Sequence, residues 1–329
     1  MSGHFIQFIV SLLLIAFILW IVFLFIFKGG NINNRDFWLI LFFIFIAIVI
    51  VLNLRPHWSV EKKHRQFFDN FLSQTDERLH DRLFGDADSL LIESKYIPFS
   101  RIVGSPLKMK VGGNNRVEII TEGPRKYDLL LQDLENAKES IHMEYFNFGV
   151  DKGSQDVRNM LIKKAREGVK VRFINENVAN LPVGHPYYRS MKKGGVEVIR
   201  FTGVRRLIGD FLTKINYRNH RKIVVIDGKI GYTGGMNISD HYFRQWRDTH
   251  LRIEGDAVAS LQLVFLNSWV ISGGKLDCAY ADLFPESEPF EETLPMQVVA
   301  DEPGMMWHPI QMGYEWALSR AEHYFYAQT

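Results

Sequence analysis

The sequence predicts an α/β domain in which helices flank a mixed β-sheet, preceded by two membrane-spanning helices. Three observations support this. Residues 141–174 read strand, helix, strand, a spacing that places two parallel strands in one sheet. Two apolar runs joined by Asp227-Gly228 are typical of an antiparallel hairpin. Two long apolar segments near the N-terminus have the length of bilayer-spanning helices.

The N-terminal region contains the two apolar segments, residues 5–27 and 37–54, and neither carries a charged side chain. At about 1.5 Å per residue, each can span a hydrocarbon core of about 30 Å. A signal peptide fits less well, because the first run is too long and no small-residue cleavage site precedes the second. Basic residues are more frequent after the second segment, which favours a cytoplasmic C-terminal side. We therefore expect residues 1–56 to form a membrane hairpin.

The remaining chain is expected to contain three regions. Residues 57–110 are predicted to form a juxtamembrane helix and a linker, and residues 111–300 an α/β domain. Hydrophobic periodicity within that domain predicts an alternation of strands and helices. Besides the hairpin, the predicted elements are strands 116–121, 141–148, 169–174 and 196–201, and helices 127–140, 156–168 and 256–269.

The hairpin carries side chains that suit a phosphate ligand. His220 and Lys222 are two residues apart on its first strand, so they leave the same face. Asn237 lies just beyond the same end of the hairpin. An imidazole can act as nucleophile or proton carrier, while an ammonium and a carboxamide can stabilise phosphoryl oxygens. These three residues predict a phosphate-handling site.

The turn fixes the expected register. A two-residue loop at Asp227-Gly228 requires positive φ angles and pairs Arg221 with Gly234 and His220 with Gly235. The glycines would let a ligand approach the backbone. Asp227 lies about 16 Å along the strand from Lys222, so any catalytic contribution from it must be indirect. A turn aspartate that bonds nearby backbone is the simpler interpretation.

These residues carry a family resemblance. His220, Lys222 and Asp227 fit the H-x-K-x4-D signature of the phospholipase D superfamily, and residues 234–237, GGMN, resemble its G-[GS]-x-N element. The resemblance implies a phospholipase D-like mixed sheet flanked by helices. Our candidate catalytic residues are His220, Lys222 and Asp227, and our candidate phosphate-binding residues are Asn237, Gly235 and Arg221.

Within that superfamily the chain most resembles bacterial cardiolipin synthases. The shared segments are the membrane hairpin, EYFNF at 144–148, KAREGVKVR at 164–172, NHRKIVVIDG at 219–228 and WRDTH at 246–250. Two positions depart from the family pattern. Asn175 begins a segment that is usually an Asp-rich turn, and Ser268 stands where an acidic residue usually precedes the tryptophan. His250 alternates with apolar residues on a predicted strand, so we expect it to be structural.

The resemblance implies phosphatidyl transfer between two phosphatidylglycerol molecules, giving cardiolipin and glycerol through a phosphohistidine, without a metal or cofactor. The expected partners are an anionic phospholipid and the membrane; no nucleic acid is expected, since Phe211 and Tyr217 are too few for base stacking. The implied location is the inner (plasma) membrane, multi-pass, with a cytoplasmic catalytic domain. The lone Cys278 suits a reducing compartment.

A weak repeat relates residues 134–143 to residues 318–327, each predicted as a helix that runs into a strand. Full-length members of the resembling family contain two fused copies, and each contributes an H-x-K motif. We therefore expect residues 301–329 to begin an incomplete second domain. The second H-x-K half would come from a missing C-terminal region or from a homodimer.

Two other functions remain open at this stage. A membrane-tethered phospholipase D or nuclease would use water as the acceptor. A non-catalytic fragment would bind anionic lipid or modulate a full-length partner.

Overall fold

The computed structural model describes Phe42 and residues 62–85, 91–104, 109–176, 179–180, 183–201, 218–301 and 308–327. The chain divides into two compact units, Met1–Trp58 with Arg206–Thr213, and Ser59–Arg205 with Lys214–Thr329. Apart from the helical Phe42, every described residue belongs to the second unit. The predicted spans 5–27 and 37–54 therefore lie outside the described residues. None of the described helices has the length and apolar composition needed to cross a membrane.

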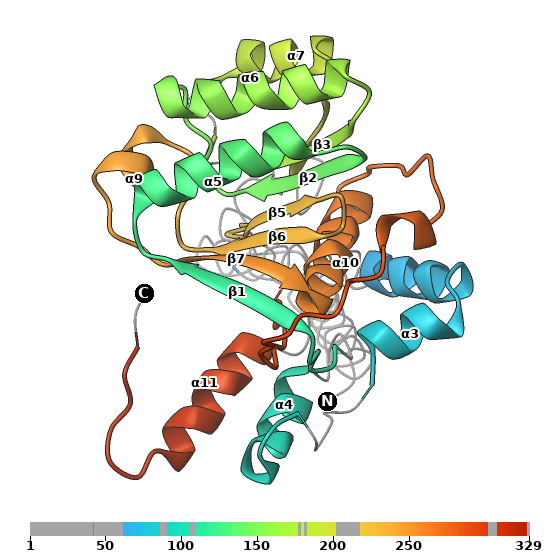
Figure 1. Cartoon of the computed structure of the whole chain (residues 1–329), viewed down its shortest axis with the longest axis vertical. Helices are drawn as coiled ribbons and strands as arrows, with labels where there is room; N and C mark the ends of the chain where they lie inside the picture. The colour runs from blue at the N-terminus through green and yellow to red at the C-terminus, as the bar shows by residue number, and fades with distance from the viewer. Residues whose placement is uncertain are drawn as a thin grey trace, which may run out of the picture. The chain divides into compact units, whose positions relative to one another are not determined.

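One seven-stranded mixed sheet forms the centre of the second unit, in the order β1-β7-β6-β5-β2-β3-β4 (Figure 1). Strands β2, β3 and β4 are parallel, and the other neighbouring pairs are antiparallel. The predicted mixed sheet flanked by helices is confirmed. The strands are β1 (Asn115–Ile120), β2 (Ser140–Tyr145), β3 (Lys170–Glu176), β4 (Glu197–Phe201), β5 (Lys222–Ile226), β6 (Ile230–Gly234) and β7 (His250–Gly255).

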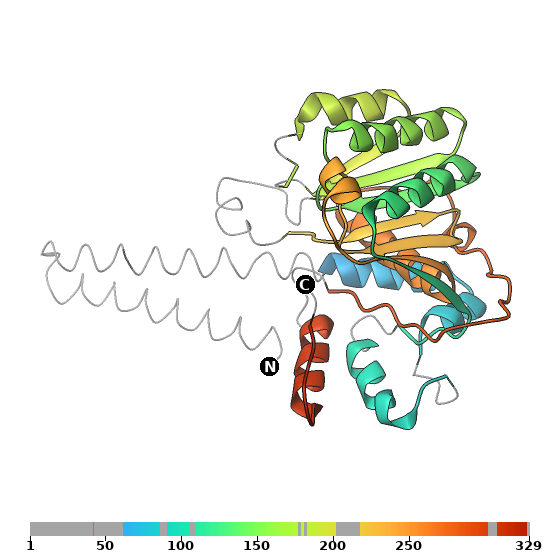
Figure 2. The ribbon, with the colours of Figure 1, turned by 60° about the vertical axis from the view of Figure 1, so that its left-hand side comes forward.

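Helices cover both faces of this sheet (Figure 1; Figure 2). On β5, Val224 and Ile226 pack with one layer, and the intervening Ile223 and Val225 pack with the other. This follows from the two-residue period of a strand that is buried on both faces. The first layer contains α5 (Gly123–Asn136), α6 (Lys152–Arg166) and α7 (His185–Lys193). The second contains α10 (Asp256–Ile271), α3 (Glu77–Leu83) and the helical residues 62–73.

Helix α10 is apolar on nearly all sides and is buried along most of its length. Such a helix needs cover on the side away from the sheet. Helix 62–73 supplies it through Phe67 and Phe71, which are buried in the same cluster. Residues predicted to form a juxtamembrane helix therefore contribute to the core of the α/β unit.

The two helices that connect the parallel strands differ in how clearly the sequence predicts them. Helix α6 ends before Gly168, whose φ of 94° is the left-handed conformation that ends many helices. Helix α7 has no counterpart among the predicted elements. Its buried positions, Tyr188 and Met191, are few and are separated by basic and polar residues, so the apolar period is weak.

The hairpin register differs by one residue from the predicted one. Ile226 pairs with Ile230, and Val225 pairs with Gly231. Asp227 and Gly228 do adopt positive φ angles of 52° and 62°, as expected. The prediction of a two-residue loop was wrong because Lys229 is a third loop residue, and its N–H donates to the Ile226 carbonyl at 2.9 Å.

The end of the described chain is a helix without a following strand. Helix α11 (Pro309–Arg320) packs beside α4 (Ile97–Gly104), where Phe99 and Trp316 place their ring centroids 5.0 Å apart. The strand predicted at the end of residues 318–327 is not formed, since residues 321–327 are assigned no strand. A strand needs a neighbour for its backbone groups, and the described chain places none beside this segment. The remaining short elements are α9 (Asp240–Arg244), η1 (Ser94–Tyr96) and η3 (Ala281–Leu283).

Candidate active site

The candidate site lies at one end of the sheet. Four segments meet there: residues 146–149 after β2, residues 176 and 179–180 at the end of β3, residues 218–221 before β5, and residues 235–239 after β6. The isolated pairing of Phe148 with Ile238 joins two of these segments. Asn180 joins the segment after β2 to the end of β3, because its amide donates to the carbonyls of Phe146 at 2.8 Å and Glu176 at 2.7 Å. Loops at the carboxyl ends of parallel strands are a common location for α/β sites.

His220 is exposed and is held against an aromatic ring. Its imidazole packs edge-to-face on Phe146, with the ring centroids 4.4 Å apart. Burial of part of the ring, followed by the positive charges of Lys222 and Arg218, lowers the pKa of His220 below its ordinary value. The imidazole is therefore neutral at pH 7, the state in which a ring nitrogen can act as a nucleophile.

Lys222 lies beneath His220 and is buried. Its Nζ donates to the backbone carbonyl of His220 at 2.7 Å and lies 5.1 Å from the centre of the Phe146 ring. Burial lowers the pKa of Lys222 to about 8, and the charge of Asp248 opposes that shift. The ammonium thus remains mostly protonated at pH 7 and is close to the imidazole.

The segment that carries His220 is fixed by its neighbours. Asn219 accepts a hydrogen bond from the Arg221 N–H at 3.0 Å and donates one to the buried Glu144 carboxylate on β2. Arg218 lies 4.8 Å above the Phe146 ring and 3.3 Å from the Glu176 carboxylate. Glu176 belongs to the segment that departs from the Asp-rich family pattern.

Asn237 enters the site from the loop after β6. Its carboxamide oxygen accepts a hydrogen bond from the Asn147 N–H at 3.2 Å, so the amide is tied to the residue next to Phe146. The structure therefore brings together His220, Lys222 and Asn237 around Phe146 and Asn147. Of the six predicted site residues, these three are the ones that converge.

Comparison with known proteins places this constellation in a family. Residues 130–269 match the family described as “Cardiolipin synthase, PLD-like domain”. The chain is 33% identical over 299 residues to a cardiolipin synthase of Oceanobacillus iheyensis, covering 88% of this chain and 60% of that protein. It is 36% identical over 222 residues to cardiolipin synthase 1 of Staphylococcus aureus, covering 66% of this chain and 45% of that protein. Residues 130–269 belong to the phospholipase D-like domain of the cardiolipin synthase family.

The chain spans about half of the length of these relatives, 60% in the first case and 45% in the second. Among solved structures, the phospholipase D family member Nuc from Salmonella typhimurium is 17% identical. That match covers 48% of this chain and 95% of Nuc, with a TM-score of 0.38.

Two other predicted site residues of this phospholipase D-like unit, Asp227 and Arg221, lie away from the convergent three. The Asp227 carboxylate accepts hydrogen bonds from the backbone N–H groups of Lys138, Glu139 and Ser140, each at 2.8 Å, at the opposite end of the hairpin. The Arg221 guanidinium donates to the Ser268 hydroxyl at 2.9 Å and to the Asp301 carbonyl at 2.5 Å. Arg221 is thus directed to α10, and Ser268, the second departure from the family pattern, is its partner there.

The glycines serve the fold of this phospholipase D-like site. The Gly235 N–H donates to the Thr249 carbonyl at 2.9 Å, so it is already engaged. A Cβ at Gly235 would overlap the Asp248 carboxylate, and a Cβ at Gly234 would overlap His250. The space expected for a ligand is therefore occupied by residues of the WRDTH segment, which explains why glycine is needed.

The other histidines near the sheet are buried. His250 has no exposed surface, and burial, followed by the charges of Lys126 and Lys222, lowers its pKa well below the ordinary value. The Nδ1 atom of His142 forms a hydrogen bond with Gln262 at 3.1 Å. Its Nε2 atom forms one with the Arg172 guanidinium, also at 3.1 Å. Both are consistent with structural roles in this family. The described residues contain no group of acidic, histidine or cysteine side chains that could hold a metal.

Three residues that contact the site were not among the sequence candidates. Phe146 and Asp248 belong to the EYFNF and WRDTH segments that resemble the family. Membership in those segments was the only sequence signal for them. Lys126, which bonds to the backbone of Met236 and Asn237, gave no signal at all.

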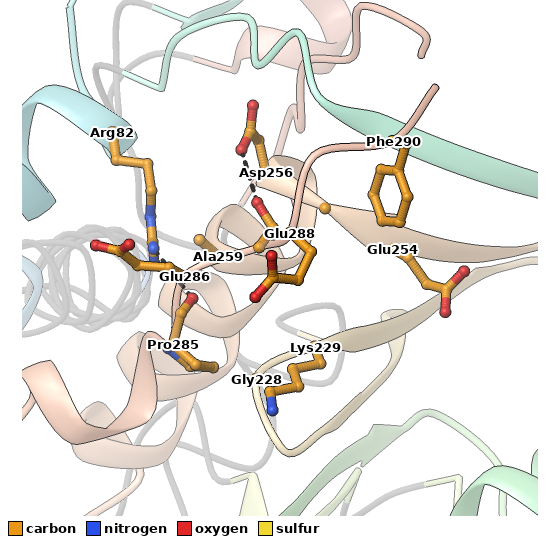
Figure 3. Close-up of a pocket in the computed structure, with 12 residues that line it drawn as sticks. Arg82, Gly228, Lys229, Glu254, Asp256, Ala259, Pro285, Glu286, Glu288 and Phe290 are labelled. Carbon is orange, nitrogen blue, oxygen red and sulfur yellow. Dashed lines mark hydrogen bonds between the residues drawn. The ribbon is translucent and has the colours of Figure 1, made fainter. Parts of the chain in front are cut away.

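A cavity of about 240 Å³ lies at the turn end of the hairpin, where Gly228 and Lys229 form part of its wall (Figure 3). Two of its charged side chains, Arg82 and Asp256, hold residues 284–287. Arg82 donates to the Pro285 carbonyl at 3.0 Å, and Asp256 accepts a hydrogen bond from Ser287 at 3.3 Å. This cavity lies at the opposite end of β5 from His220 and belongs to the packing of the phospholipase D-like unit.

Proposed function

We propose that this chain supplies one half of a phosphatidyltransferase site of the cardiolipin synthase type. In this proposal two phosphatidylglycerol molecules give cardiolipin and glycerol, and an anionic phospholipid is the substrate class. The observation that carries the proposal is the exposed, neutral imidazole of His220 on Phe146, with the ammonium of Lys222 bonded to the backbone carbonyl of the same residue. The similarity to cardiolipin synthases supports the choice of reaction.

His220 is proposed as the nucleophile. One of its ring nitrogens forms a bond to phosphorus, while the bond from phosphorus to the glycerol oxygen breaks and that oxygen takes a proton from a second acid. The hydroxyl group of another phosphatidylglycerol then bonds to phosphorus, the N–P bond breaks, and the hydroxyl proton returns to the acid. Lys222 and Asn237 stabilise the charge on the non-bridging oxygens throughout.

This scheme needs a second proton carrier, and the described residues bring only His220 to the site. The buried His250 and His142 are unsuited to the role, because neither ring is exposed. We propose that the second H-x-K half comes from another phospholipase D-like domain, either in a longer form of the chain or in a second copy.

The test is the formation of cardiolipin from phosphatidylglycerol liposomes, measured by mass spectrometry with this chain and with His220→Ala. Product that disappears in the variant supports the transferase and requires a second half-site. Intact-protein mass spectrometry tests this half-site by itself, because a phosphatidyl adduct on His220 is expected even when turnover is not completed. An adduct or product that is unchanged in His220→Ala would refute the assignment. Release of phosphatidic acid in place of cardiolipin would identify a phospholipase.

We further propose that residues 5–27 and 37–54 anchor the chain in the inner membrane, with the α/β unit on the cytoplasmic side. The support is the sequence alone: two uncharged segments long enough to span the bilayer, with an excess of basic residues after the second. A lipid substrate is then presented to the site by the membrane that holds the enzyme.

The single cysteine tests this orientation. Cys278 is the only cysteine in the sequence and it is exposed, so a maleimide that cannot cross membranes should label it only from the side that the α/β unit occupies. We expect labelling in inside-out membrane vesicles and not in intact cells. A Cys278→Ser variant controls for background. Labelling of intact cells would place the unit outside and contradict the proposed topology.

A further inference from the structure

Lys126 lies in an environment that disfavours a positive charge. Its side chain is fully buried in the first turn of α5, where the helix dipole is unfavourable to a cation. Removing an ammonium from water also carries a large free-energy cost unless its donors are satisfied. Burial, followed by the charge of Lys222, lowers the pKa of Lys126 well below its ordinary value, and Asp248 opposes this shift. A lysine at such a site requires a specific structural reason.

The contacts of its side-chain nitrogen give that reason. Nζ donates to the Met236 carbonyl at 2.7 Å and to the Asn237 carbonyl at 3.3 Å. It also lies 5.1 Å from the centre of the Tyr145 ring and 5.7 Å from that of Phe243. Both hydrogen bonds therefore go to the backbone of the loop that carries Asn237. Within the described part of the chain no carboxylate forms an ion pair with it.

The same loop is fixed from its other side by the segment after β2. The Asn237 side-chain oxygen accepts a hydrogen bond from the Asn147 N–H at 3.2 Å, and the Ile238 N–H donates to the Asn147 carbonyl at 3.3 Å. The Gly149 N–H donates to the Ile238 carbonyl at 2.8 Å. These bonds determine where the loop meets residues 147–149, and Lys126 holds the two preceding carbonyls from inside the domain.

We propose that Lys126 is a positioning residue that orients the Asn237 carboxamide toward the phosphate of the bound lipid, so this inference rests on the proposed function. Lys126 acts through the backbone of Met236 and Asn237, and it makes no contact with the substrate. Without these bonds the loop keeps its attachment to residues 147–149 but loses the constraint on the peptide that sets the direction of the Asn237 side chain.

The test is a double-mutant cycle on the full chain, in which calorimetry measures the binding of inorganic phosphate. Lys126→Met and Asn237→Ala are each expected to weaken phosphate binding about tenfold, as the loss of one good hydrogen bond to a charged group predicts. The double variant is expected to bind no more weakly than Asn237→Ala alone, because Lys126 acts only through Asn237. Independent, additive losses would overturn the inference.

A second buried lysine provides the matched control. Lys164 on α6 is also buried, and its Nζ donates to the Glu135 carbonyl at 3.0 Å and to Glu167 at 2.7 Å. Lys164→Met should lower the melting temperature without changing phosphate affinity, which separates positioning from general stability. If Lys126→Met fails to fold, Lys126→Gln, which keeps an N–H donor, should bind phosphate with an affinity between wild type and Asn237→Ala. Wild-type affinity in a folded Lys126 variant would refute the role.

The outcomes for the different variants also separate this inference from the proposed function. Wild-type protein that binds no phosphate, or that binds it equally well after Asn237→Ala, overturns the site itself and the inference with it. If Asn237→Ala weakens phosphate binding and Lys126→Met does not, the site stands and only the role of Lys126 is overturned.

Discussion

Replacing Lys222 with methionine is expected to lower the rate of phosphatidyl transfer about 10²–10³-fold, the usual effect of removing one group that stabilises transition-state charge. Methionine keeps most of the buried aliphatic volume, while the ammonium that donates to the His220 carbonyl at 2.7 Å is lost. The measurement is the initial rate of cardiolipin formation, or of the His220 adduct where turnover needs a second half.

The same substitution has a readout that needs no activity. The positive charge of Lys222 disfavours protonation of His220, so its removal is expected to raise the pKa of His220 toward the ordinary value of about 6.5. An NMR titration of the His220 ring measures this shift. Lys229→Met is the matched control, because Lys229 is exposed at the opposite end of the same hairpin. An unchanged His220 titration in Lys222→Met would contradict the geometry proposed for the site.

Local pattern was sufficient to place His220, Lys222 and Asn237 near one another. The alternation of strand side chains puts the first two on one face, and Asn237 follows directly where the second strand ends. The one-residue error in register did not matter for Asn237, because it lies beyond the ladder. The error did matter for Gly235, whose N–H is engaged with Thr249.

The same alternation argues against Arg221 as a phosphate ligand. Arg221 lies between His220 and Lys222, so its side chain leaves the opposite face of the strand, where α10 packs. The hydrogen bond to Ser268 agrees with this direction. A basic residue within a motif is thus not automatically part of its site.

Contacts between distant parts of the chain could not be predicted from local pattern. Lys126 lies on a helix about a hundred residues before the hairpin, and its pattern there is that of any polar helix position. Phe67 and Phe71 belong to a segment rich in charge, yet they complete the core beside α10. In both cases a neighbour that is remote in sequence determines the role of the residue.

Replacing Asp227 is expected to affect stability more than chemistry, although Asp227 belongs to the family signature. Its carboxylate accepts hydrogen bonds from three successive backbone N–H groups between α5 and β2, and its φ of 52° is a conformation that alanine tolerates poorly. We expect Asp227→Ala to lower the free energy of unfolding by about 2–4 kcal/mol, from the loss of charge-assisted hydrogen bonds together with backbone strain. Chemical denaturation measures this change.

Two further substitutions at the same position divide the effect of Asp227→Ala into its causes. Asp227→Gly removes the carboxylate without strain at positive φ, and Asp227→Asn keeps one acceptor, so their losses should be smaller than that of alanine. Asp128→Ala, at an exposed position on α5, should leave stability nearly unchanged. Phosphate affinity should stay at the wild-type value in every Asp227 variant that folds, because the carboxylate lies about 16 Å along the strand from Lys222. A folded Asp227 variant that no longer binds phosphate would show that the signature aspartate acts on the site after all.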